Sequence, residues 1–479
     1  MTVLRASGAA SVPVSFCAAE DRTRILRAAI LASSMGFIDS SVTAIALPAM
    51  RAALGASLVE AQWIGTAYLL VLSSLVLVGG AMGDRFGLAR VFGYGIRIFV
   101  AGSLACAAAQ TPEQMIAARA VKGLGAALMV PGSMALVARA FPRDEAGRAL
   151  GLWAAASTLT TALGPVIGGM FVTWGGEIGW RLIFALNLPL GLAALWLVRG
   201  RTPGDLGRPG TPVDLPGAAL AAGGLGLLAW ALTDPGAGGL IWGLAGAALM
   251  AFLGWEAVSP APMLRLGLFR NRTLAVTNLV TLALYFALNG VMFYLPMTAV
   301  SAWGVSALEV TAAFLPISVL IGVLSAPAGR MADRWGAGVL MGLGAGLVAC
   351  AYGGLWLAAP LGQFWAHVVP LAALAGLGLG LAVAPLTAAA MQGAEEGEQG
   401  AASGINNAVA RVAAMVAVAL LGRVAALAYG PGEPGFGVTG TGAQHLGATG
   451  QAFAQVALIA CLAAATAAVL ALFVRRPVR

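Results

Sequence analysis

Long apolar segments follow one another along almost the whole chain, and short polar connections separate them. Fourteen of these segments are close to, or longer than, the length of about 20 apolar residues that a helix needs to cross a bilayer. The pattern therefore predicts an all-α, polytopic membrane protein with fourteen transmembrane helices. The predicted spans are residues 25–48, 62–82, 91–109, 114–138, 149–173, 182–198, 215–233, 240–258, 273–297, 310–328, 337–358, 366–390, 402–424 and 452–474.

Two of the polar connections share an Asp-Arg-x-Gly sequence. Asp84-Arg85-Phe86-Gly87 joins the second span to the third, and Asp333-Arg334-Trp335-Gly336 joins the tenth to the eleventh. When the seventh and eighth spans are set aside, each turn joins the second span to the third within a set of six. This layout predicts two six-helix bundles related as parallel repeats, with two helices inserted between them. The alternative is a chance match between two positively charged loops, each with a helix cap.

The predicted organisation has five parts, and the boundaries follow the polar connections. They are a cytoplasmic tail (1–24), an N-terminal six-helix bundle (25–198), a linker with two extra transmembrane helices (199–272), a C-terminal six-helix bundle (273–474) and a cytoplasmic end (475–479). The tail has no apolar core of signal-peptide length, so the first helix is expected to act as an uncleaved signal anchor.

Composition and charge support a membrane protein and exclude a nucleic-acid partner. The 479 residues are 60% hydrophobic and 10% charged, with a mean hydropathy of +0.89, whereas about 25% of the residues in soluble proteins are charged. The net charge of +8 comes from arginines in short clusters between apolar segments, mostly on the side shared by both termini. The opposite side holds Arg51, Arg181 and Arg423. Because basic residues favour the cytoplasmic side of membrane proteins, both termini are expected there.

Several motifs, in a consistent order and on the matching spans, resemble signatures of the major facilitator superfamily, specifically its fourteen-helix drug:proton antiporter branch. They lie at residues 36–48 with Asp39, 80–90, 119–125, 164–169 and 180–191. The chain departs from the family pattern in two places. After Gly87, Leu88 and Ala89 leave only Arg90 where the family has consecutive basic residues, and Lys122, the chain's only lysine, stands where the family usually has an amide.

The resemblance implies a major facilitator fold and a proton-coupled antiporter that exports small amphiphilic compounds, such as drugs and toxicants, by alternating access. It also implies the inner membrane of a bacterium as the location, with the substrate, protons and bilayer lipid as partners. The proton gradient would be the energy source, with no cofactor, and the transporter would be a monomer.

Asp39 is the one carboxylate well inside an apolar segment, where a charge by default marks a path for protons or substrate. At about 1.5 Å per residue, Asp39 lies roughly 21 Å from the cytoplasmic face and Arg119 roughly 8 Å from the outer face of a core about 30 Å thick. The two residues therefore sit at nearly the same depth. We predict that Asp39 and Arg119 carry the proton coupling, because protonation of Asp39 would free Arg119. A fixed ion pair, or hydrogen bonds from Asp39 to neighbouring Ser or Thr residues, is the alternative.

Further polar residues within the spans are candidates for lining a substrate cavity. Lys122 shares a helix face with Arg119, so it either adds positive charge that suits an anionic or zwitterionic substrate, tightens the hold on Asp39, or faces loops and headgroups. Arg411 lies near mid-depth and Asn406 and Asn407 lie one turn before it, although asparagines there often form hydrogen bonds between helices. Asn289 is the fifth cavity candidate.

Two other groups have predicted roles in conformational change. The turn residues Gly80, Asp84, Arg85, Gly87, Arg90, Asp333 and Arg334 are expected to form a cytoplasmic latch, with Asp84 capping the third helix. Gly164, Pro165, Gly168 and Gly169 form a helix-packing signature. Glycines four apart let helices approach closely, and the proline kinks the helix, so this segment serves either as a deformable seal between the halves or in ordinary tight packing.

Catalytic chemistry is not indicated. The chain has no nucleophile–base pair, no nucleotide-binding loop and no connection large enough for a catalytic domain, so an ATP-driven pump is excluded, and an enzyme or a non-transporting receptor is disfavoured. His367, His445 and the four cysteines have no metal-ligand spacing. Two transporter alternatives remain. One is a dedicated exporter of a single endogenous metabolite or lipid-like molecule, anionic if Lys122 and Arg411 face it; the other is uptake by symport, which the motif at 164–169 opposes.

Overall fold

The computed structural model describes residues 16–394, 398–430, 435–440 and 442–474. Fourteen helical spans in these ranges are long and apolar enough to cross a membrane, which confirms the predicted number. The seventh predicted span, 215–233, coincides with α8 (Leu215–Thr233), and most of the others extend beyond their predicted ends. The last span, α15 (Ala443–Ala471), begins well before residue 452. Most of the predicted tail, residues 1–15, and the predicted cytoplasmic end, 475–479, lie outside the described residues.

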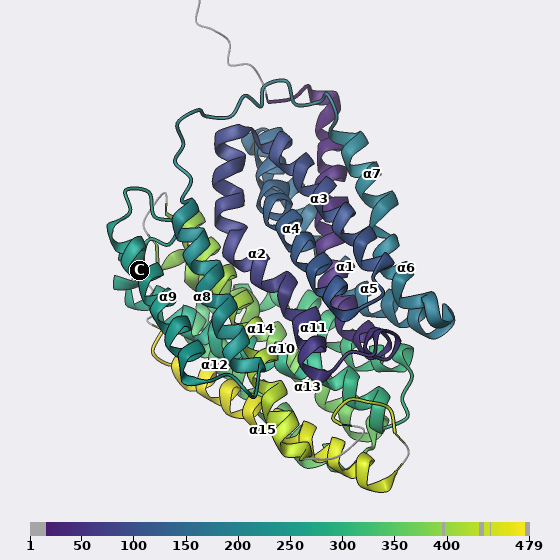
Figure 1. Ribbon diagram of the computed structural model, residues 1–479. Helices are drawn as coiled ribbons and strands as arrows, with labels where there is room; N and C mark the ends of the chain where they lie inside the picture. Colours follow the sequence, from purple (N-terminus) through teal and green to yellow (C-terminus); the bar gives the residue numbers. More distant parts are fainter. Residues whose placement is uncertain (1–15, 395–397, 431–434, 441, 475–479) are drawn as a thin grey trace, which may run out of the picture.

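The first six spans form one bundle, drawn from purple to blue in Figure 1. The sixth span is broken at Leu186 into two short helices, α6 and α7. The helices of this half are α1 (Arg22–Leu54), α2 (Leu58–Phe86), α3 (Leu88–Ala108), α4 (Pro112–Ala140), α5 (Arg143–Trp174), α6 (Gly179–Ala185) and α7 (Asn187–Val198).

The last six spans form the second bundle, drawn from green to yellow. A π-helical turn, Phe364–Val368, leads into its fourth span. The helices of this half are α10 (Arg272–Ala302), α11 (Ala307–Trp335), α12 (Ala337–Ala358), α13 (Val369–Gln392), α14 (Gln399–Tyr429) and α15.

The second helix of each half has the same local design, which explains the repeated turn. Both α2 and α11 are 29 residues long and begin in a capping box, Ser57 with Glu60 and Ser306 with Glu309. In each box the serine hydroxyl accepts from the glutamate N–H while the glutamate carboxylate accepts from the serine N–H. Both helices end at a glycine with positive φ, 101° at Gly87 and 92° at Gly336, a conformation that other residues adopt only with strain.

The two inserted helices, α8 and α9 (Gly239–Val258), form a hairpin on one side of the molecule (Figure 1). Helix α8 contacts α2 of the first half and α14 of the second. Helix α9 packs against α8, and Ala245 and Glu256 are its buried residues. The hairpin therefore covers the line along which α2 and α14 meet.

The prediction that Asp84 caps the third helix is wrong. Asp84 lies within the last turn of α2 and is exposed, so it does not cap α3. Instead the carboxylate of Asp205, from the connection between α7 and α8, accepts hydrogen bonds from the N–H groups of Leu88 (3.0 Å) and Ala89 (2.7 Å). These are two of the free N–H groups at the start of α3. A residue far along the chain therefore supplies the cap.

The cap formed by Asp205 is expected to contribute to the stability of the protein. The substitution Asp205→Ala removes the acceptor for both N–H groups and is expected to lower the free energy of unfolding by about 1–2 kcal/mol. Thermal unfolding of the purified protein measures the change. The matched control is Asp84→Ala in the same turn, which is expected to change the stability by less than about 0.5 kcal/mol. Equal losses in the two variants would contradict the assignment of the cap to Asp205.

Four hydrogen bonds between the two halves lie at the end of the bundle where α1 meets α2, here termed the α1–α2 face. Arg51 Nη1 donates to the carbonyl of Phe436 (2.5 Å), and Gln62 Nε2 donates to the carbonyls of Val418 (2.8 Å) and Ala419 (3.0 Å). The N–H of Leu308 donates to Thr173 Oγ1 (3.1 Å). By the arginine distribution, this face is the predicted outer one.

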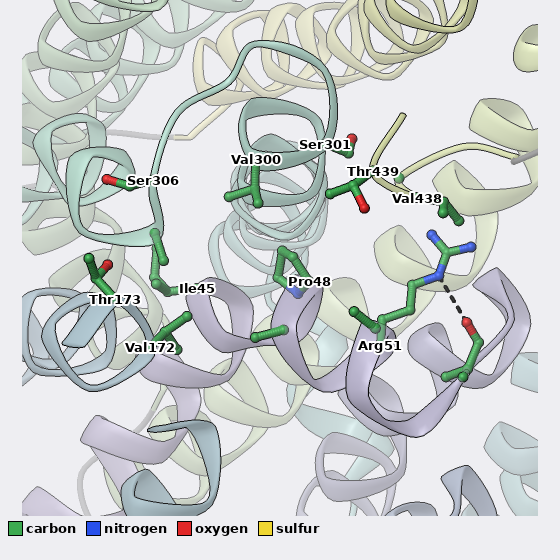
Figure 2. Close-up of a pocket in the computed structure, with 16 residues that line it drawn as sticks. Ile45, Pro48, Arg51, Val172, Thr173, Val300, Ser301, Ser306, Val438 and Thr439 are labelled. Atoms are coloured by element: carbon green, nitrogen blue, oxygen red, sulfur yellow. Dashed lines mark hydrogen bonds between the residues drawn. The ribbon is translucent and has the colours of Figure 1, made fainter. Parts of the chain in front are cut away.

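A pocket of about 520 Å³ lies at the α1–α2 face between the two halves. Figure 2 shows Ile45, Pro48 and Arg51 of α1 on one side of it and Val300 of α10 with Thr439 on the other. Arg51 Nε also donates to the carbonyl of Ala56 (3.0 Å), which holds the guanidinium at the end of α1. The halves are thus in direct contact at this face.

Candidate functional site

Asp39 on α1 is buried and ion-paired with two cations from α4. Arg119 Nη1 lies 2.7 Å from Asp39 Oδ2, and Lys122 Nζ donates to the other oxygen, Oδ1. The three side chains are at most 2% exposed. The sequence predicted the Asp39–Arg119 pairing from depth alone, whereas the engagement of Lys122 with Asp39 was one of several possibilities.

Neighbouring groups fix the geometry of this ion-paired cluster of Asp39, Arg119 and Lys122. Arg119 Nε donates to the carbonyl of Ile64 (2.9 Å), and its Nη1 also donates to Thr43 Oγ1 (3.2 Å). Thr43 Oγ1 in turn donates to the carbonyl of Asp39 (2.6 Å). Arg119 is thereby attached to α1 and to α2, so a movement of its side chain affects how α4 packs against both helices.

Lys122 lies in an aromatic enclosure, away from any loop or headgroup. Its Nζ is 4.7 Å from the ring centroid of Phe99 on α3 and 4.7 Å from that of Phe184 on α6. Cation–π contacts of this kind stabilise a desolvated ammonium group. With Asp39 ionised, the cluster carries two positive charges and one negative charge, so it retains a net positive charge within the first half.

A separate cavity of about 260 Å³ lies between the two halves near the middle of the helices. The first half contributes residues of α1, α2 and α4, including Phe37 and Tyr68. The second half contributes residues of α10 and α14, including Tyr285 and Arg411. Both halves therefore line the same space, which we term the central cavity.

The central cavity contains three of the five predicted cavity residues. Asn289, Asn407 and Arg411 line it. Asn406 is buried away from it, where its side-chain oxygen accepts from Thr281 Oγ1 of α10 (2.6 Å). Lys122 is absent from the lining because it is sequestered by Asp39. The sequence could place these residues at the right depth but could not tell which face of a helix meets the cavity.

Tyr68 separates the ion-paired cluster from the central cavity. Its side chain lines the cavity, and the guanidinium of Arg119 lies 4.9 Å from its ring centroid. Tyr68 is itself 1% exposed. A ligand in the cavity would therefore contact Tyr68. Protonation of Asp39 would act on Arg119, which contacts the same ring.

The glycines of the helix-packing signature belong to α5 and lie against two other helices, α1 and α11. A Cβ at Gly164 would collide with Ser41 of α1, and one at Gly168 would lie 2.9 Å from Val42 Cγ1. On the other side of α5, a Cβ at Gly169 would lie 2.8 Å from the Cα of Leu308 on α11. Pro165 lies inside the same helix. The motif thus brings α5 against the helix that carries Asp39 and also against the second half.

The predicted latch residues lie in and near the last turns of α2 and α11. Arg85 lies 5.2 Å from the ring centroid of Phe86. Arg90 faces a pocket between α3 and α7, and Gly80 packs near Pro131. Gly87 ends α2, and Asp333 and Arg334 occupy the matching last turn of α11.

Sequence reasoning missed the residues that complete the site. Phe99 gave no usable signal, because aromatic residues within apolar segments are usually filler or belt residues. Phe184 lies within the motif at 180–191, but nothing in the sequence related it to Lys122. Asp205 lies in a polar connection and has no local motif that marks it as a cap. The described residues contain no group of three or more His, Cys, Asp and Glu side chains that could hold a metal ion.

Comparison with known proteins identifies the family. The family model described as Major Facilitator Superfamily matches residues 29–418. The chain is 33% identical over 401 residues to the methylenomycin A resistance protein of Bacillus subtilis, covering 81% of this chain and 84% of that protein. It is 30% identical to the tetracenomycin C resistance and export protein of Streptomyces glaucescens, covering 87% and 78% of the two chains.

A solved structure shares the fold. A bacterial homologue of the human lysosomal transporter Spinster, in an inward-facing and unoccupied conformation, superposes with a TM-score of 0.70 at 14% identity, covering 95% of this chain and 97% of the other. At this identity the likeness shows the fold alone. Together with the fourteen spans and the family match, it establishes the major facilitator fold. The chain therefore belongs to the Major Facilitator Superfamily, a family of transporters and not of enzymes, and is related to its resistance and export proteins.

Proposed function

We propose that the protein is a proton-coupled antiporter that exports small amphiphilic compounds by alternating access. The observation that carries the proposal is the buried Asp39 carboxylate, which binds Arg119 and Lys122, with Arg119 in contact with Tyr68 of the central-cavity lining. The proposed location is the inner membrane of a bacterium, with both termini cytoplasmic and the α1–α2 face outside. The names of the two relatives, which describe antibiotic resistance and export, support the direction of transport.

The ion-paired cluster supplies a proton-dependent switch. While Asp39 is ionised, it holds Arg119 and Lys122 and thereby connects α1 to α4. Protonation of Asp39 removes the negative charge and leaves two adjacent buried cations, which repel each other at low dielectric. Arg119 would then move, and with it Tyr68 at the cavity wall. Substrate release to the outside and proton uptake from the outside would thus alternate.

The contacts between the halves support the conformational part of the cycle. Four hydrogen bonds between them lie at the predicted outer face, and Gly169 allows α5 and α11 to approach closely there. Both observations correspond to a conformation in which the two halves are in contact at this face.

The function is tested by dye accumulation in an efflux-deficient bacterial host. Cells that produce the protein are expected to accumulate less of an amphiphilic dye such as N-phenyl-1-naphthylamine than cells with an empty vector. A protonophore should bring both strains to the same level, because it removes the driving force. A difference between the strains that survives the protonophore would contradict proton coupling.

Lys122 has an expected effect on pH dependence. The substitution Lys122→Gln removes one of the two cations that favour the ionised form of Asp39, so Asp39 would hold its proton up to higher pH. The pH at which export is half-maximal is expected to rise. Dye export at a series of cytoplasmic pH values measures the profile. Arg97→Gln, which removes an exposed cation on α3, is the control and should leave the profile in place.

A dedicated exporter of a single anionic metabolite is the second candidate. The observation that favours it is Arg411, a cation in the central cavity.

A further inference from the structure

Arg411 on α14 is a cation without a carboxylate partner. It lines the central cavity, and its Nε is buried with no hydrogen-bond partner in the described part of the chain. None of the described residues that line this cavity is acidic. We infer that Arg411 binds a negatively charged group of the transported compound, such as a carboxylate, sulfonate or phosphate, a conclusion that rests on the central cavity being the transport site proposed above.

The distribution of charge between the two sites supports this assignment. The carboxylate of Asp39, next in sequence to Ser40 of the cavity lining, already binds Arg119 and Lys122 through its two oxygens. Ionisable side chains inside membrane spans are rare and are usually paired or face a functional path. Arg411 has no such pair among the described residues, so the central cavity has an excess positive charge. An anionic ligand would compensate it.

The chemistry of the guanidinium agrees with an anion site. Arginine stays charged in proteins and presents a planar set of donors that matches carboxylate, sulfonate and phosphate oxygens. A structural role would use these donors on carbonyl groups, as Arg51 does with Ala56 and Phe436. No such hydrogen bond is formed by Arg411 within the described residues.

The rest of the cavity defines the body of the ligand. Tyr68 and Tyr285 provide aromatic faces, and Phe37 adds a third ring. Asn289 Nδ2 and Asn407 Nδ2 donate to carbonyls of their own helices, at 2.8 Å to Tyr285 and 3.2 Å to Ser403. Their side-chain oxygens remain as acceptors. The site therefore suits a flat, largely apolar anion that also carries a hydrogen-bond donor.

Two probes that differ in one group test the inference. The anionic probe is 8-anilinonaphthalene-1-sulfonate, and the neutral one is N-phenyl-1-naphthylamine, which has the same ring system without the sulfonate. Binding of each is measured by fluorescence with the full-length protein in lipid nanodiscs, after subtraction of empty nanodiscs. The wild-type protein is expected to bind the sulfonate about tenfold more tightly than the neutral probe.

The variant Arg411→Gln is expected to weaken binding of the sulfonate about tenfold and to leave the neutral probe unchanged. Arg411→Lys, which retains the charge, should restore part of the loss. Arg423→Gln on the same helix is the matched control, because Arg423 does not line the cavity, and should bind both probes as the wild type does. Thermal unfolding of each variant verifies that it is folded.

Other outcomes would overturn the inference. Equal weakening of both probes by Arg411→Gln would mean that Arg411 shapes the cavity without recognising charge, and no change with either probe would mean that it does not face the ligand. These binding results do not depend on a proton gradient. If Arg411→Gln still exports the neutral dye in a protonophore-sensitive manner, the proposed function stands, whatever the two probes show about the anion preference. If the wild type binds the sulfonate but shows no protonophore-sensitive export, the proposed function fails alone.

Discussion

Asp39→Asn is expected to abolish protonophore-sensitive export of amphiphilic dyes, with a loss of about tenfold or more in the rate. Asparagine has nearly the shape of aspartate but cannot bind or release a proton, so the ion-paired cluster would be fixed in one charge state. Dye efflux from energised cells measures the rate. Asp144→Asn, an exposed carboxyl in the first turn of α5, is the control and should export normally.

A loss in Asp39→Asn alone would also follow from misfolding, because the substitution leaves Arg119 and Lys122 buried together without a counter-charge. Removing one member of a buried ion pair typically costs about 3–5 kcal/mol. The double variant Asp39→Asn/Lys122→Gln leaves Arg119 as the single cation, so it should regain stability, measured as the thermal unfolding temperature, without regaining coupled export. Full export by this double variant would show that Asp39 is a structural ion-pair residue.

Gly169→Ala is expected to shift the protein away from the conformation that is closed at the α1–α2 face. The added Cβ would lie 2.8 Å from the Cα of Leu308, 2.8 Å from Thr311 Cγ2 and 2.9 Å from the carbonyl oxygen of Ala307. Because two of these atoms belong to the α11 backbone, they cannot rotate away. Overpacking of this kind typically costs about 1–3 kcal/mol. The cost applies only where α5 and α11 touch, so the opposite conformation gains about tenfold in population.

Cysteine labelling measures this shift. Val300, which faces the pocket between the halves (Figure 2), is replaced by cysteine in a background without the four native cysteines. A membrane-impermeant maleimide added from outside should label it faster when Gly169 is alanine. Gly151→Ala is the matched control on the same helix, since a Cβ there meets nothing within 4 Å. Equal labelling in both variants would contradict a role of Gly169 in the closed conformation.

The global architecture was accessible from sequence because it depends on patterns that every helix repeats. Apolar length gave all fourteen spans, and the two Asp-Arg-x-Gly turns located the repeat, which the structure explains through matched capping boxes and glycine termini on α2 and α11. The Asp39–Arg119 pairing followed from depth, a quantity that helix geometry fixes without knowledge of the tertiary contacts.

What the sequence could not provide was rotation about the helix axis and contact between distant segments. Asn406 and Asn407 are neighbours, yet one binds Thr281 and the other faces the central cavity. From its depth, Lys122 could either bind Asp39 or line the cavity. The structure shows that it binds Asp39, enclosed by Phe99 and Phe184. Asp205 took the role expected of Asp84 because a connection more than a hundred residues later folds back onto α3.

The α8–α9 hairpin has a consequence for how the transporter meets the lipid around it. Because α8 contacts both α2 and α14, a change in the angle between the two halves makes these helices slide against α8. Beneath the hairpin an apolar space of about 430 Å³, bordered by α2, α8, α9, α10 and α14, leaves room for such sliding. Helix α9, mostly exposed, forms the outer wall. Acyl chains therefore contact the hairpin instead of the line along which α2 and α14 meet. In a twelve-helix core without the hairpin, this line would be open to the bilayer.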